Sequence, residues 1–160
     1  MNRGPRAPSA PGTRLTRILS GALLVAALLS GCVTQQGGTT GKLGRAADDV
    51  QSALTSAELG LNQDRDGLTL PGATDTLLEN MLEEVHLTAE KMGKLSPKTA
   101  VELDRQDTAL QLAGEAERAL ATARGNLDVS GSASSATEAD IRHLAGLADV
   151  IGRQTQGWAP

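Results

Sequence analysis

The apolar residues between positions 42 and 62 recur every three or four residues, which is the spacing of one face of an α-helix. At about 100° per residue they fall within a stripe about 80° wide. The members of this stripe are Leu43, Ala47, Val50, Leu54, Ala57 and Leu61. A face of this kind has to be buried against another element, because a lone amphipathic helix leaves it in water. The segment therefore predicts a helix that packs against others.

Three further segments have apolar faces with the same period and predict helices at about 76–95, 97–124 and 137–154. Their faces comprise Leu78, Met81, Leu82, Val85, Ala89 and Met92 in the first, Leu103, Leu110, Ala113 and Leu120 in the second, and Ile141, Leu144, Ala145, Leu147, Ala148 and Ile151 in the third. Capping-box spacings at Thr76 and Thr137, the pair Ser96-Pro97, and a C-cap signal at Gly125-Asn126 set the expected boundaries. The polar stretch 104–107 predicts a bend or a solvated section.

The composition favours helices that lie close together. The chain has no Phe, no Tyr and one Trp, Trp158, and no segment has the period of a strand. We therefore expect an all-α, up-and-down four-helix bundle that forms a single domain over residues 42–160. The lack of aromatic side chains also weakens the case for a sugar platform, a haem pocket or a stacked ligand.

The first 31 residues have the features of a secretory signal peptide. Four arginines and no acidic residue precede Cys32, and residues 18–29 are almost entirely apolar. That run is too short to span a bilayer, which needs about 20 apolar residues. The next positions, Leu29-Ser30-Gly31-Cys32, resemble the lipobox of bacterial lipoproteins. The alternative is an ordinary secretory signal with a cysteine present by chance.

The lipobox resemblance implies that Cys32 is acylated and becomes the first residue of the mature protein. Residues 32–41 would then be the lipidated cysteine and a flexible, Gly-rich tether. From Cys32 onward the chain carries 11 basic and 19 acidic residues, a formal charge of −8. This charge argues against nucleic acid as a partner and against binding of anionic lipid through a polybasic segment. We therefore expect membrane attachment through the lipid on Cys32 alone.

Residues 62–67 match the first half of an EF-hand calcium loop. Asn62, Asp64 and Asp66 place oxygen atoms at alternate positions, and Gly67 follows them. The second half of the motif is missing, because Ala73 stands where the loop needs a bidentate Glu. The alternative to a calcium site is a polar loop, with Asx-type turns, that joins two helices.

Two further pairs have the Glu-x-x-His spacing of ferritin-like di-iron bundles. Glu83 and His86 lie on the predicted second helix, and Asp140 and His143 lie on the fourth. However, His86 lies about 100° from the centre of its apolar face, and Glu83 lies nearly opposite that centre. Inward-facing ligands are therefore not expected, and the alternative is two solvent-exposed histidines.

No other catalytic pattern is present in the sequence, which lacks a Gly-rich phosphate loop and a nucleophile elbow. We therefore expect a non-enzymatic lipoprotein on the extracytoplasmic face of the cell membrane or envelope. Its helical bundle would bind an envelope protein or have a structural role, and it needs no cofactor beyond the lipid. A metal-binding or sensing module and a ferritin-like di-metal protein are the alternatives.

Overall fold

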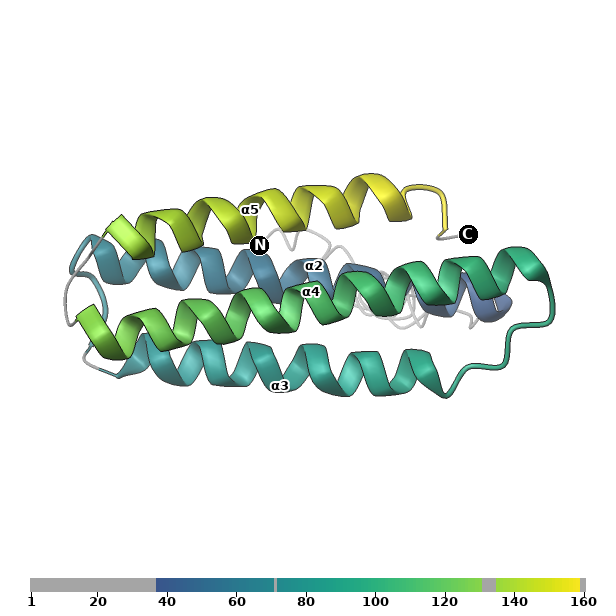
Figure 1. The fold of residues 1–160 in the computed structure, drawn as a ribbon, viewed down its shortest axis with the longest axis horizontal. Helices are drawn as coiled ribbons and strands as arrows, with labels where there is room; N and C mark the ends of the chain where they lie inside the picture. The colour runs from purple at the N-terminus through teal and green to yellow at the C-terminus, as the bar shows by residue number, and fades with distance from the viewer. Residues whose placement is uncertain (1–36, 71, 131–134, 159–160) are drawn as a thin grey trace, which may run out of the picture. The chain divides into compact units, whose positions relative to one another are not determined.

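The computed structural model of the chain describes residues 37–70, 72–130 and 135–158, and these form four α-helices and no strand (Figure 1). The helices are α2 (Gly38–Arg65), α3 (Ala73–Gly93), α4 (Ala100–Ser130) and α5 (Ser135–Thr155). This confirms the predicted all-α four-helix bundle. The predicted signal peptide, Leu29 to Cys32 and residues 33–36 of the predicted tether lie outside the described residues.

No helix among the described residues is long and apolar enough to cross a membrane.

Successive helices run in opposite directions, as Figure 1 shows. Helix α2 contacts the other three helices, whereas α3 and α5 do not contact each other. Helices α2 and α4 therefore meet across the bundle, between α3 and α5. Both helices bury small side chains, which suits close packing of the core. Those residues are Ala47, Ala53 and Ala57 on α2, and Ala109, Ala113, Ala116 and Ala123 on α4.

The core follows the predicted faces closely in three of the four helices. All six stripe residues of α2 are buried, and the fully buried Leu78 and Leu144 anchor α3 and α5. Helix α4 differs, because Leu103 of its predicted stripe is 49% exposed. Leu103 lies in the first turn of α4, at the end of the bundle where its neighbours do not cover it. The buried face of α4 instead consists mainly of alanines, which a search for large apolar side chains passes over.

The stretch 104–107, predicted as a bend or a solvated section, is part of the continuous helix α4, and its Asp104 and Asp107 are exposed. The Gln106 side chain is buried, and its Nε2 donates hydrogen bonds to the carbonyl oxygens of Met92 (2.7 Å) and Leu95 (3.1 Å). Met92 lies in the last turn of α3, and its carbonyl oxygen also accepts the Leu95 amide (3.1 Å); Leu95 lies in the segment beyond the helix, past the intrahelical donors. The polar stretch therefore closes the end of a neighbouring helix.

Several predicted boundaries are displaced. Helix α2 begins at Gly38, so residues 38–41 of the predicted tether belong to the helix. Helix α4 begins at Ala100 because Thr99, and not Ser96, caps it: Thr99 Oγ1 accepts a hydrogen bond from the Glu102 amide (3.1 Å). The Glu102 carboxylate in turn accepts from the Lys98 amide (2.7 Å). This reciprocal pair resembles a capping box placed three residues later than predicted.

Tertiary contacts displace the remaining boundaries. Helix α3 begins at Ala73, before Thr76, and α5 begins at Ser135, so that Thr137 is a buried residue within the helix. Helix α4 continues through Gly125-Asn126 to Ser130. Asn126 Nδ2 donates a hydrogen bond to Asp140 Oδ2 on α5 (2.8 Å), which stabilises the last turns of α4 against their neighbour.

The role of Gln106 predicts a measurable loss of stability. Gln106→Leu keeps most of the side-chain volume but removes both hydrogen bonds and leaves the Leu95 carbonyl oxygen without its Gln106 donor, so we expect the free energy of unfolding to fall by about 1–3 kcal/mol. Urea denaturation followed by circular dichroism measures this change. Gln111→Leu, at an exposed position of the same helix, is the control and should stay within about 0.5 kcal/mol of the wild type. Equal stability of the two variants would contradict the assignment.

Candidate functional site

Only Asp66 and Gly67 of the predicted calcium loop lie outside a helix. Helix α2 runs to Arg65, so Asn62 and Asp64 belong to its last turn. Asp64 Oδ1 accepts hydrogen bonds from the hydroxyls of Thr69 (2.7 Å) and Thr74 (3.1 Å). The carboxylate thus connects the end of α2 to the connecting segment and to the start of α3.

The other two predicted calcium ligands also have protein partners. Asn62 Nδ2 donates to the Glu58 carbonyl oxygen (3.0 Å), and Asp66 Oδ1 accepts from Arg65 Nε (3.0 Å). Each of the three side chains therefore bonds a different protein partner. Hydrogen bonds of this kind suit a polar connection between two helices.

The two Glu-x-x-His pairs lie on helices that do not contact each other. Glu83 and His86 are exposed on α3, and His86 Nδ1 lies 3.1 Å from Glu117 Oε1 of α4. On α5, Asp140 is buried and His143 is exposed. Over the described ranges there is no group of three or more His, Cys, Asp or Glu residues that could hold a metal ion. The pair His86–Glu117 is a surface contact between helices that the sequence did not predict.

Two depressions on the bundle are open to solvent and largely polar. One, of about 370 Å³, lies between α2 and α5, and the other, of about 320 Å³, lies between α2 and α3. The first is lined by Gln51, Asp149, Gly152, Arg153 and Gln156, and the second by Asp49, Asn80, Glu83, Glu84, Leu87, Thr88 and Lys91. Neither shape encloses a small molecule, whereas ligand pockets bury most of their ligand.

The segment between α2 and α3 presents two large apolar side chains to solvent. Leu68 and Leu70 are 76% and 78% exposed, more than any other large apolar residue of the described chain. The hydrogen bonds to Asp64 hold this segment, and Arg65 Nη1 bonds Glu138 Oε2 of α5 (3.0 Å) beside it. We call residues 66–72 the α2–α3 loop. It displays apolar surface on a supported backbone, a feature of interaction sites.

The opposite end of the bundle joins three helices around Arg105. Its Nη1 donates to Thr40 Oγ1 near the start of α2 (3.2 Å), and its guanidinium carbon lies 5.8 Å from the ring centroid of Trp158, beyond α5. Trp158 is half-buried and packs against the core. Trp158 therefore helps to close this end of the bundle.

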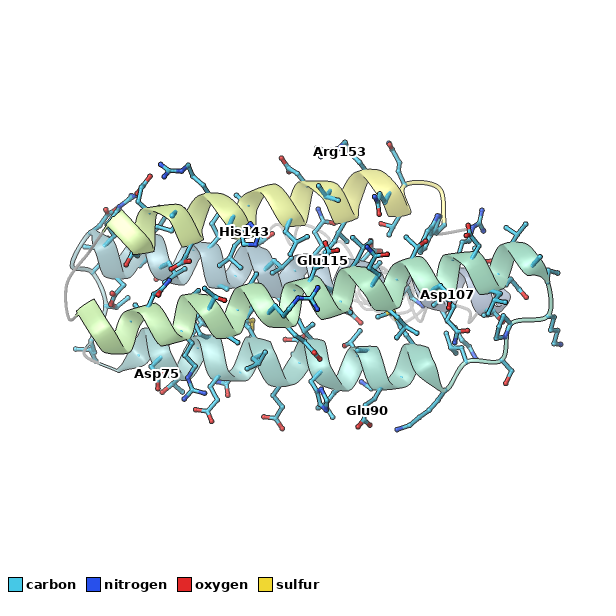
Figure 2. The ribbon with its side chains drawn as sticks, viewed as in Figure 1. Asp75, Glu90, Asp107, Glu115, His143 and Arg153 are labelled. Carbon is cyan, nitrogen blue, oxygen red and sulfur yellow. The ribbon has the colours of Figure 1, made fainter. Side chains whose placement is uncertain are left out.

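An ion-pair cluster joins α3 and α4 near the α2–α3 loop. Arg124 Nε lies 2.6 Å from Asp75 Oδ1, and Arg124 Nη2 lies 3.1 Å from Glu79 Oε2. The hydrogen bond from Arg124 holds the pKa of Asp75 below its ordinary value. Figure 2 shows Asp75 at this end and Asp107 towards the other. The sequence contained no signal for the cluster, because Arg124 is 49 residues from Asp75.

In comparisons with known proteins, no family model matches the chain, and no curated protein or solved structure is significantly similar to it.

The Asp75–Arg124 pair predicts a dependence of stability on pH. Because the folded pKa of Asp75 is lowered, the pair stabilises the fold at neutral pH. This stabilisation is lost as the pH falls through the ordinary aspartate value, about 3.9, and then through the lowered folded value. In Asp75→Asn, the free energy of unfolding should therefore fall less between about pH 6 and about pH 2 than in the wild type.

Urea titrations at several pH values measure this difference. Asp107→Asn is the matched control, since Asp107 is exposed on α4 and makes no ion pair with any described residue. It should retain the acid sensitivity of the wild type. If Asp75→Asn and Asp107→Asn have the same pH profile, the Asp75–Arg124 pair contributes nothing to acid sensitivity.

Proposed function

We propose that this protein is a bacterial lipoprotein, anchored by an acylated Cys32 to the extracytoplasmic face of the cell membrane or envelope. Its helical bundle acts as a non-enzymatic module that contacts another envelope protein. The observation that carries the proposal is the lipobox-like Leu29-Ser30-Gly31-Cys32 directly after a short apolar segment with a basic leader.

The position of the bundle in the chain supports this proposal. The described domain starts at Gly37, five residues after Cys32, so a protein processed at Cys32 consists of the bundle and a short connection. Helix α2 has 28 residues and is about 42 Å long at 1.5 Å per residue. The bundle therefore holds the α2–α3 loop about 40 Å from the point where the anchored chain enters it.

The α2–α3 loop is the surface that suits a partner protein best. Leu68 and Leu70 leave apolar area in water, and burial of that area by a partner is favourable at about 25 cal/mol per Å². Asp64 holds the loop through hydrogen bonds from Thr69 and Thr74. The loop therefore loses little further conformational entropy when a partner binds.

Acylation at Cys32 can be tested directly. Cells that express the full chain are grown with an alkyne fatty acid, and we expect label on the wild type and none on Cys32→Ser, because the variant lacks the thiol that carries the acyl group. Mass spectrometry should find a wild-type chain that begins at residue 32. Thr34→Ser is the control and should remain labelled. Label on Cys32→Ser, or an unlabelled wild type, would overturn the proposal.

The partner surface can be tested by photo-crosslinking in native membranes. A photoreactive amino acid at Leu68 should give an adduct with one envelope protein, whereas the same residue at Thr55, exposed midway along α2, should not. The purified partner should then bind the wild type and lose at least about tenfold in affinity for Leu70→Asp, because a buried carboxylate without a counter-charge is costly.

Thr55→Asp is the control for that affinity measurement and should bind like the wild type. Equal affinity of Leu70→Asp and Thr55→Asp would exclude the α2–α3 loop as the contact surface.

A further inference from the structure

The fold separates the charges of the bundle along its length. The end at which α2 starts comprises the terminal two turns of each helix and the segments beyond them, residues 37–45, 86–107 and 148–158, and we call it the α2-start end. It carries seven basic and five acidic residues, a formal charge of +2. Residues 46–85 and 108–147, the rest of the bundle, carry four basic and fourteen acidic residues, a formal charge of −10. One end of the bundle therefore has a net positive charge although the bundle as a whole is negative.

The cations at the α2-start end are largely available to an outside partner. Lys42, Lys98 and Arg153 are exposed, and none of them makes an ion pair with a described residue. Figure 2 shows Arg153 on α5 towards this end.

Two of the five acidic groups at this end are already engaged. Glu102 accepts the Lys98 amide in the cap of α4, and Glu90 bonds Lys94 (2.9 Å). Asp104, Asp107 and Asp149 are exposed carboxylates, and they limit the net charge to +2.

Apolar side chains accompany these cations. Val101 and Leu103 are 60% and 49% exposed in the first turn of α4. Side chains in a helix tilt towards its N-terminus, so those of the first turn extend past the end of the bundle. Trp158 lies half-buried at the same end, beneath Arg105. Apolar groups next to lysines are the combination that binds the interface of an anionic bilayer.

The covalent connection brings this end to the membrane. Five Cα steps separate Cys32 from Gly37, and a chain of that length spans at most about 18 Å. The Debye length at physiological ionic strength is about 8 Å, so the charges at the α2-start end lie within a few screening lengths of the headgroups. The acidic remainder of the bundle extends up to about 40 Å further along its axis.

We propose that the α2-start end docks on the surface of an anionic membrane, with Lys42 and Lys98 against the lipid phosphates and Val101 and Leu103 at the interface. This inference rests on the proposed acylation of Cys32, which keeps the bundle at a high local concentration beside the membrane. Docking of this end directs the acidic body and the α2–α3 loop away from the bilayer. Each lysine near an anionic surface favours the docked state by a factor of about five.

Trp158 supplies the probe for this orientation. It is the only tryptophan and the chain has no tyrosine, so the intrinsic fluorescence comes from the α2-start end alone. The acylated protein, purified from membranes, is reconstituted into vesicles that contain a lipid with a nitroxide on its headgroup. Quenching is compared between phosphatidylcholine vesicles and vesicles that also contain phosphatidylglycerol. We expect stronger quenching with phosphatidylglycerol and loss of the difference in high salt.

The charge reversals Lys42→Glu and Lys98→Glu, made together, should lower the docked-to-undocked ratio by more than about tenfold. Arg118→Glu with Arg142→Glu changes the net charge equally at exposed positions away from this end and should leave quenching unchanged. Quenching that does not depend on phosphatidylglycerol, or that falls equally in the two double variants, would overturn the docking.

Acylation is read separately, by the mass of the purified chain and by flotation with the vesicles. An acylated chain that floats with anionic vesicles but shows no lipid-dependent quenching overturns the docked orientation and leaves the proposed anchor intact. A chain without acyl groups overturns both proposals.

Discussion

The burial of one apolar face from each helix in a shared core is the interaction on which the rest of the bundle depends. Alanines make up much of this core on α2 and α4, and leucines such as Leu54 and Leu120 are buried among them. Because dense packing has to be reached without Phe or Tyr, the helices lie close and the core is thin. Helices α3 and α5 are consequently held apart, which separates the two Glu-x-x-His pairs.

A thin core of small residues leaves the ends of the bundle to be closed by polar groups. Gln106 supplies donors to the end of α3, Asp64 accepts the hydroxyls of the α2–α3 connection, and Arg105 joins Thr40 to Trp158. Buried or half-buried polar groups of this kind stabilise only when they are paired, and each of these has its partner. The residues that resembled a calcium loop are accounted for by this structural requirement.

The two ends of the bundle differ in charge and in the apolar residues that they expose. The proposed membrane contact lies at one end and the proposed partner contact at the other. One end combines lysines with exposed Val101 and Leu103, and it includes the start of α2, which lies close in sequence to the proposed lipid anchor. The other displays Leu68 and Leu70 on an otherwise acidic body. An anchor at Cys32 and a cationic end that meets anionic lipid would together orient the bundle, so that the leucines face away from the membrane.

The sequence by itself determined the fold class, because amphipathic periodicity is a local property: the predicted face of α2 is buried, and those of α3 and α5 are buried or partly buried. It also carries the lipobox-like motif, which needs no fold to be recognised. Only the tertiary structure decided how the ends of α3 and α4 are held, since Gln106 and Asn126 act through partners on other segments. The start of α4 depends instead on the local pair Thr99 and Glu102. The separation of charge likewise depends on which helix ends meet in space. Hydrogen bonds and ion pairs between residues distant in sequence have no periodicity along the chain, so no local sequence pattern predicts them.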